Sequence, residues 1–422
     1  MENLLPADIK LDIFSRLPAE SVLQCRQVCK TWRSLLHLPV FAHMHLCRTQ
    51  HLEDHSYDNH SNDAAKMGLL LLVALKGERY SNYQLCYHEY DENDERSFKL
   101  PLTIINHPVV KPTYALVGSC NGLIYFTLKQ PYNDPFYICN PITREYVILP
   151  RFNNSNLIVG GYPKGCMVWG FGYLPSTNEY KVVRIHLYTN PYQPSGWYKH
   201  DEIDAQVYTL GSGSGWRKIK YSSPLPICKL LAPWGVLANG ALYWLGSGGK
   251  SFTFDLADEE LRYFLSPPYE DEDNYSYFQM WGGRLSYVHK KVNEGIDIWS
   301  FKKNKKSGGV QKDMKEQEYQ SWNWSKEFTI AMNMEAGDYE PFALTKSGEV
   351  LMSFRRSYEQ KLLSRYDPKT ATLTKLDTDF VLSSAITHVN SFVSLKDIGE
   401  DAKIIEPAEG LPELVKLQPE CC

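Results

Sequence analysis

The sequence lacks a long apolar run, a dense set of cysteines and an excess of charge of one sign. The longest apolar run covers residues 67–75, and nine residues are too few to cross a bilayer, which needs about 20. The ten cysteines include no Cys-x-x-Cys pair, so they do not form the framework of a disulfide-rich scaffold. Lys and Arg number 45 against 49 Asp and Glu, a balance without overall attraction to nucleic acid. We therefore expect neither a membrane span nor nucleic-acid binding.

The first dozen residues also lack an unbroken apolar stretch, because four charged residues interrupt them: Glu2, Asp8, Lys10 and Asp12. A secretory signal needs an uninterrupted apolar centre. We therefore expect reduced cysteines and a cytoplasmic and/or nuclear location.

The composition instead favours a folded chain rich in strands and turns. Apolar residues make up 43% of the 422 residues, enough to bury a core, and the 27 Gly, 24 Pro and 28 Tyr indicate many turns and strands. At roughly 100–200 residues per domain, this length allows two to four domains, or one large repeat domain with a small appendage.

The N-terminal 47 residues have helical periodicity. Apolar residues recur at helical spacing on a first short stretch, namely Ile9, Ile13, Phe14 and Leu17. Pro6 suits the first turn of that helix, and Leu17-Pro18 ends it, because the residue before proline avoids the helical region. A second stretch runs from about Ala19 to Pro39. Three short helices bury too little surface to be stable alone, so we expect a partner to cover them. The other interpretation is a helical cap packed wholly on the next domain.

From residue 67 onward, short apolar and aromatic runs alternate with turns, which is typical of an all-β domain. Four dipeptides are plausible two-residue hairpin turns: Asn121-Gly122, Asn239-Gly240, Gly282-Gly283 and Ser347-Gly348. A three- or four-stranded unit recurs about six times, and stacking such units radially hides their faces. We expect residues 389–395 to form the last strand and to complete the first unit.

Two parts of the chain resemble known families. Leu5-Pro6-x-Asp8-Ile9-x-x-Asp12-Ile13-Phe14, followed by Arg26-x-Val28-Cys29-Lys30-x-Trp32-Arg33, resembles an F-box. Gly118-Ser-Cys-Asn-Gly-Leu123, Cys139-Asn-Pro-Ile-Thr-Arg144 and Gly170-Phe-Gly-Tyr173 resemble the F-box-associated, kelch-like domain of plant F-box proteins. The chain departs from true kelch repeats in the irregular spacing of its units and in the scarcity of Gly-Gly pairs.

The resemblance implies a small all-α trihelical F-box followed by an all-β, propeller-like domain of about six blades. We place the F-box at residues 1–47, a polar linker at 48–66, the propeller at 67–396 and a flexible tail at 397–422. By resemblance, the F-box docks on a Skp-type adaptor, and through it on a cullin, within a Skp–cullin–F-box ubiquitin ligase. The residues implied in that docking face or its support are Leu5, Pro6, Ile9, Ile13, Leu17, Pro18, Leu23, Val28 and Trp32.

The propeller would then recruit an unidentified target protein for ubiquitination, and the chain itself would be a non-catalytic subunit. Aromatic residues on Pro-containing loops are candidate target contacts, although strand-edge packing explains them equally: Tyr132, Phe136, Tyr192, Trp197, Tyr198 and Tyr269. The alternatives are a propeller lectin or small-molecule enzyme with accessory helices, and a scaffold that binds the adaptor without a cullin.

Motifs for chemistry are absent from the sequence. We find no catalytic motif and expect no cofactor. A metal site is not expected either, because zinc needs four converging ligands and the Cys and His residues between 25 and 47 fit helical packing. The sequence leaves open the target, whether the target must be modified, whether the basic stretch at 290–306 directs nuclear import, and whether Cys421-Cys422 carries a lipid.

Overall fold

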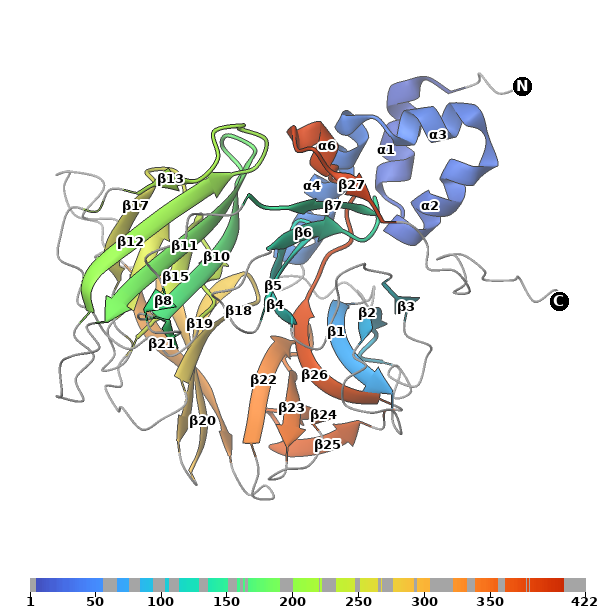
Figure 1. Ribbon diagram of the computed structural model, residues 1–422. Coiled ribbons are helices and arrows are strands. Elements are labelled where there is room, and N and C mark those ends of the chain that lie inside the picture. The colour runs from blue at the N-terminus through green and yellow to red at the C-terminus, as the bar shows by residue number, and fades with distance from the viewer. Residues whose placement is uncertain are drawn as a thin grey trace, which may run out of the picture. The chain divides into compact units, whose positions relative to one another are not determined.

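The protein is seen here as a computed structural model (Figure 1). It describes residues 5–55, 67–75, 84–93, 103–105, 114–128, 136–150, 158–159, 162–163, 166–189, 200–219, 221, 233–246, 251–264, 267, 276–291, 294–303, 322–331, 338–355, 361–376, 378 and 380–405. The chain divides into two compact units. The first comprises residues 1–151, 210–213 and 377–422, and the second comprises residues 152–209 and 214–376.

Helices occupy the start of the first unit. They are α1 (Ala7–Ser15), α2 (Ala19–Val28), α3 (Lys30–Leu36) and α4 (Pro39–His55), with a short α6 (Leu395–Ile398) near the other end of the chain. Pro6 and Pro18 immediately precede α1 and α2, and the extended residue Cys29 separates α2 from α3. None of the helices in the described ranges is long and apolar enough to cross a membrane.

Pro39 begins a helix instead of only ending the preceding stretch, as proline is well tolerated in a first helical turn. The helix α4 reaches His55, so residues 48–55 of the expected polar linker are helical. Residues 56–66 lie outside the described part of the chain.

Strands form the rest of both units. In the first unit they are β1 (Met67–Leu75), β2 (Gln84–Tyr90), β3 (Thr103–Ile104), β4 (Tyr114–Cys120), β5 (Leu123–Leu128), β6 (Tyr137–Asn140), β7 (Glu145–Ile148), β26 (Phe380–Thr387) and β27 (Lys403–Ile404). In the second unit they are β8 (Ile158–Val159), β9 (Tyr162–Pro163), β10 (Cys166–Leu174), β11 (Glu179–Thr189), β12 (His200–Thr209), β13 (Arg217–Lys218), β14 (Val236–Ala238), β15 (Ala241–Leu245), β16 (Ser251–Asp255), β17 (Glu260–Phe264), β18 (Ser276–Trp281), β19 (Arg284–Lys291), β20 (Gly295–Lys303), β21 (Trp322–Ala331), β22 (Asp338–Leu344), β23 (Val350–Arg355), β24 (Leu362–Asp367) and β25 (Thr372–Leu376).

These strands make six antiparallel sheets with the strand order of propeller blades, which confirms the predicted fold class and number of units. The first unit holds β26-β1-β2-β3 and β27-β7-β6-β5-β4. The second unit holds β10-β11-β12-β13, β14-β15-β16-β17, β18-β19-β20-β21 and β22-β23-β24-β25, with a small β8-β9 pair besides. Within each blade, neighbouring strands are consecutive in the sequence and joined as a meander, except that β26 and β27 return from late in the chain to lie beside β1 and β7.

A late strand does complete the first sheet, but it is β26 and not residues 389–395. Figure 1 shows the red β26 beside the blue β1, and Leu70 pairs with Ile386 in that ladder. Residues 389–394 have no strand partner, because their backbone is bound by side chains: the amide of Asn140 donates to the carbonyls of Ser391 and Val393. The expected flexible tail also begins too early, since β27 adds to the second sheet beside β7.

Three of the four expected turns have the predicted two-residue form. Asn121 and Gly122 have φ of 50° and 83°, and Asn239 and Gly240 have φ of 49° and 75°. Positive φ at both positions is what a hairpin turn compatible with strand twist requires. The turn at Gly282-Gly283 is similar, whereas Ser347-Gly348 lies in a longer loop between the paired residues Leu344 and Val350.

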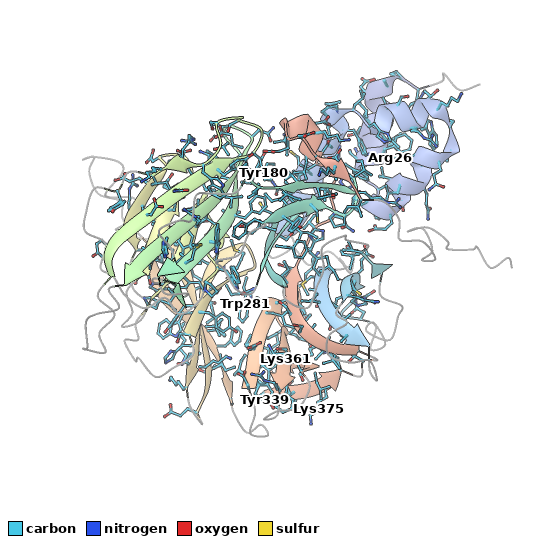
Figure 2. The ribbon with its side chains drawn as sticks, in the orientation of Figure 1. Arg26, Tyr180, Trp281, Tyr339, Lys361 and Lys375 are labelled. Atoms are coloured by element: carbon cyan, nitrogen blue, oxygen red, sulfur yellow. The ribbon has the colours of Figure 1, made fainter. Side chains whose placement is uncertain are left out.

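Apolar and aromatic residues fill the spaces between neighbouring sheets of the second unit. The clusters are built around large buried rings such as Trp244, whose indole N–H donates to the Trp169 carbonyl at 3.2 Å. Figure 2 labels three further buried aromatic residues of this unit, Tyr180, Trp281 and Tyr339. The hydroxyl of Tyr277 on β18 donates to the Pro341 carbonyl on β22, which ties two adjacent blades.

Buried carboxylates in the second unit are paired with cations. The side chain of Asp297 is fully buried between Lys326 at 2.8 Å and Lys291 at 2.9 Å. Burial alone would raise the pKa of Asp297, but the hydrogen bonds of Lys326, Thr329 and Lys291 lower it to about 2. This carboxylate therefore stays charged throughout the range in which histidines titrate.

Among the described residues of the first unit, the buried histidines are His45, His88 and His388. Burial lowers the pKa of all three, to about 4 for both His88 and His388. At neutral pH each imidazole is therefore a neutral hydrogen-bonding or packing group.

We predict that a methyl group at Gly122 destabilises the fold more than one at Gly240. Both residues have positive φ, so each Gly→Ala change costs about 1 kcal/mol for the left-handed backbone. An added Cβ at Gly122 would lie 2.1 Å from Ser391 Oγ, whereas nothing lies within 4 Å of one at Gly240. Urea unfolding should give a loss of about 2–4 kcal/mol for Gly122→Ala. Equal losses for the two variants would contradict the predicted packing of Ser391 on this turn.

We also predict that stability falls as the pH drops from about 6.5 to about 4. In this range the unfolded chain binds protons on His88 and His388, while the folded chain does not, so the unfolded state is favoured. Each such histidine should contribute a slope of about 1.4 kcal/mol per pH unit. Unfolding free energies measured at several pH values check the slope. The variant His388→Gln should have a slope smaller by the contribution of one histidine, about 1.4 kcal/mol per pH unit. A wild-type slope of zero in this window would be inconsistent with the buried neutral histidines.

Candidate functional site

Helix α1 carries apolar side chains on two flanks, and only one flank is covered by the protein itself. Leu11 and Phe14 point inward and are 8% and 6% exposed. Ile9 and Ile13, one helical turn apart, are 43% and 46% exposed. A helix of a self-contained domain normally has one apolar stripe and one polar face. The second apolar stripe of α1 is therefore available to another protein.

Further exposed apolar residues lie just before α1 and at the end of α2. Leu5 lies one turn before Ile9, and Val28 at the end of α2 is 65% exposed. We use the name outer face for six exposed residues: Leu5, Pro6, Ile9, Ile13, Pro18 and Val28. All six belong to the set that the sequence analysis assigned to docking.

The other three predicted docking residues support the helices from within. Leu17, Leu23 and Trp32 are half-buried and pack on the helical core. The Trp32 ring meets Phe14 edge to face, with centroids 4.7 Å apart. Because these side chains hold the helices together, changing them would alter the folding of the helical unit as well as any docking surface.

Polar contacts fix the ends of the helices. Asp12 accepts from Arg16 at 2.7 Å and from Arg48 of α4. The Cys29 sulfur accepts from the backbone N–H of Trp32 at the start of α3. Burial raises the pKa of the neighbouring Cys25 thiol, although a backbone hydrogen bond opposes the shift.

The histidine and cysteine residues of the helices take part in such local contacts. The Nε2 atom of His45 lies 3.0 Å from the Leu17 carbonyl, and Nδ1 of His37 lies 2.6 Å from the Arg33 carbonyl. In the described part of the chain, no three His, Cys, Asp or Glu side chains converge as metal ligands.

Two exposed apolar residues near the helices were missed by the sequence analysis. Leu38 and Val40 flank the start of α4 and are 42% and 52% exposed, while Phe41 beside them is fully buried. The predicted helical stretch ends at Pro39, and the predicted docking residues include none beyond Trp32. The apolar run from Leu35 to Phe41 was the available signal.

Five of the six predicted target contacts lie outside the described residues: Tyr132, Tyr192, Trp197, Tyr198 and Tyr269. The sixth, Phe136, is a buried core residue and not a loop anchor. It is 1% exposed, its ring is stacked with Tyr125, and its carbonyl accepts from the backbone N–H of Leu149. The side chain therefore has no free surface to offer a target, and strand packing explains this aromatic residue.

Among the described residues, Ser276 and Ser119 each form a hydrogen bond with a buried histidine. Ser276 Oγ lies 3.0 Å from His289 Nδ1, and Ser119 Oγ lies 2.7 Å from His388 Nδ1. A general base must gain a proton near the working pH. With a pKa of about 4, His388 is suited to a structural hydrogen bond instead of to activating Ser119.

Comparison with known proteins matches both parts of the chain. Residues 3–49 match the F-box-like family, and residues 70–397 match the F-box associated beta propeller domain family. Among curated proteins, the chain is 28% identical to the F-box protein At3g07870 of Arabidopsis thaliana, over 86% of this chain and 85% of that protein.

Two further relatives come from the same plant. The putative F-box protein At2g16220 is 24% identical over 95% of this chain and 91% of its own length. The F-box/kelch-repeat protein At4g19930 is 27% identical over 62% of this chain, and the match spans 58% of that protein. Because the helices and the six sheets agree with these matches, and the propeller match alone covers residues 70–397, the chain belongs to the F-box proteins that carry an F-box-associated β-propeller domain.

Proposed function

We propose that this chain is the substrate-recognition subunit of a Skp–cullin–F-box ubiquitin ligase, acting in the cytoplasm and/or the nucleus. Its F-box docks on a Skp-type adaptor, and its propeller holds a target protein. The outer face carries this proposal, because a folded helical unit keeps six apolar or proline residues exposed while its inner flank is already filled. Membership of the F-box family names the kind of partner that such a face would bind.

The physical basis of docking is the removal of these side chains from water. Burying an apolar side chain of this size contributes about 1.5–3 kcal/mol. Ile9 and Ile13 lie on one face of α1 at the spacing with which a helix enters an apolar groove. The adaptor would supply that groove.

The mechanism of such a subunit is proximity. A target held on the propeller has its lysines close to a ubiquitin-charged enzyme brought by the cullin, which raises their effective concentration. The bond-making groups belong to that enzyme, so the chain itself needs no catalytic residue and no cofactor. Our proposed target contacts remain Tyr132, Tyr192, Trp197, Tyr198 and Tyr269.

We predict that two charges on the outer face abolish adaptor binding. In the variant Ile9→Asp/Val28→Asp, docking would bury two carboxylates in an apolar groove without partners, which is strongly unfavourable. Affinity for a purified plant Skp-type adaptor, measured by calorimetry, should fall at least about 100-fold, or about 3 kcal/mol.

Tyr263→Asp is the matched control, because Tyr263 is a large aromatic residue of the second unit whose side chain is similarly exposed, at 50%. This variant should bind the adaptor as the wild type does. Circular dichroism checks that both variants remain folded. Unchanged affinity of the Ile9→Asp/Val28→Asp variant would rule out the outer face as the docking site.

A second prediction separates a ligase subunit from an adaptor-binding scaffold. The chain, the adaptor and a cullin should elute together in gel filtration, and Ile9→Asp/Val28→Asp should elute alone. A chain–adaptor complex that leaves the cullin behind would replace the ligase proposal with a scaffold.

The same double variant is the better tool for trapping targets in plant cells. Deleting residues 1–47 would remove Phe41 and His45, whose rings contact Phe392 of the propeller side. Point changes on the outer face leave that contact intact.

A further inference from the structure

Residues 388–398, here named the C-terminal clasp, contact both the F-box helices and the two sheets of the first unit. The clasp follows β26 and ends with α6. Its residues were expected to form a strand and the start of a flexible tail. Instead, its side chains and backbone are bound on two sides by residues far away in the sequence.

On the F-box side, the centre of the contact is the ring of Phe392, which is 3% exposed. The guanidinium carbon of Arg26 lies 4.3 Å from the centroid of this ring, and the rings of His45 and Phe41 lie 5.1 Å and 5.5 Å away. Arg26, labelled in Figure 2, also donates to the Leu36 carbonyl at 2.6 Å. A cation between an aromatic face and a carbonyl is a specific arrangement that simple apolar collapse does not produce.

A chain of hydrogen bonds also runs from the F-box to the first and second sheets. The Asn390 amide donates to Glu20 Oε1 of α2 at 2.7 Å, which leaves Asn390 Oδ1 as an acceptor for His388 Nε2 at 3.2 Å. Because Nε2 then carries the proton of the neutral ring, His388 Nδ1 accepts from the Ser119 hydroxyl on β4 at 2.7 Å. Each member of this chain therefore has one consistent donor or acceptor role.

On the sheet side, buried side chains hold the backbone of the clasp. Asn140, fully buried, donates to two clasp carbonyls, those of Ser391 and Val393. Glu145, 7% exposed, accepts from Ser394 Oγ at 3.0 Å and from the Leu395 N–H at 2.6 Å, at the beginning of α6. These contacts fix the clasp to β6 and β7.

We propose that the C-terminal clasp holds the F-box in one orientation on the first two sheets, with Phe392 and Asn390 as its positioning residues. The consequence rests on the proposed function: the clasp sets where a bound target lies relative to the ubiquitin-charged enzyme. The F-box residues that meet the clasp are Glu20, Arg26, Phe41 and His45, none of which belongs to the outer face. Adaptor docking and the clasp therefore use different surfaces of the F-box.

The test changes the charges of the two side chains that form the Asn390–Glu20 hydrogen bond. Asn390→Asp places a carboxylate against Glu20, and the repulsion should open the contact. The double variant Asn390→Asp/Glu20→Gln restores one donor and one acceptor, because the Gln amide can donate to the new carboxylate. This pair is preferable to removing the Phe392 ring, since loss of a buried ring threatens the whole cluster.

Hydrogen–deuterium exchange on the full-length chain, alone and bound to a Skp-type adaptor, measures the outcome. Asn390→Asp should speed exchange at least about tenfold in α2 and in the turn at residues 119–122, and the double variant should return both to wild-type rates. Asn239→Asp, the same change in an exposed turn of the second unit, should leave both regions unchanged. Adaptor affinity should stay within about twofold in all variants.

Wild-type exchange rates in Asn390→Asp, or a double variant that does not recover, would overturn the proposal. Loss of adaptor affinity in step with faster exchange would also overturn it, because the clasp face would then belong to the docking site. Failure of the wild-type chain to bind the adaptor would instead refute the proposed function, and the exchange results on the free chain would still decide whether the clasp exists.

Discussion

The F-box has more apolar surface than four short helices can cover, and this constraint accounts for much of the first unit. Leu11 and Phe14 fill the interior, yet α1 still carries Ile9 and Ile13 on its opposite flank. A third side of the helical unit is closed by a residue from the far end of the chain, Phe392. The F-box is therefore completed partly by its own propeller side, and the remaining apolar flank defines the surface left for another protein.

The parts of the fold that depend on neighbours in sequence could be predicted from the sequence. Helical spacing located the N-terminal helices, whose residues resemble an F-box, and Asn-Gly dipeptides located two hairpin turns, because a left-handed pair of residues is a local requirement. Pairing between distant segments could not be read in the same way. Residues 389–395 have the composition of a strand, but the amide of Asn140 competes for their carbonyls, and β26 takes the place beside β1.

In the candidate site too, residues with local signals could be predicted and residues whose role depends on distant contacts could not. Ile9, Ile13 and Val28 were identified from spacing and family resemblance, and the structure places them outside. Leu17 and Trp32 could not be distinguished from these exposed residues in the sequence, because they carry the same apolar signal but pack inside. Phe136 shows the converse, since an aromatic residue beside prolines can equally be core. The contacts of Arg26 and Glu20 with the C-terminal segment gave no signal, because their partners lie more than 360 residues away.

The position of β26 means that the first blade is completed only after residues 380–387 have been synthesised. Strand β1 begins at residue 67, but its neighbour β26 is translated only at residues 380–387, and Phe392 emerges later still. Strand β26, which completes the first blade, and Phe392, whose ring packs on Arg26, therefore leave the ribosome almost together. A prematurely terminated chain would carry the outer-face residues of the F-box on a body whose first blade is unfinished. Only a chain that extends beyond Phe392 joins these distant segments into one folded unit.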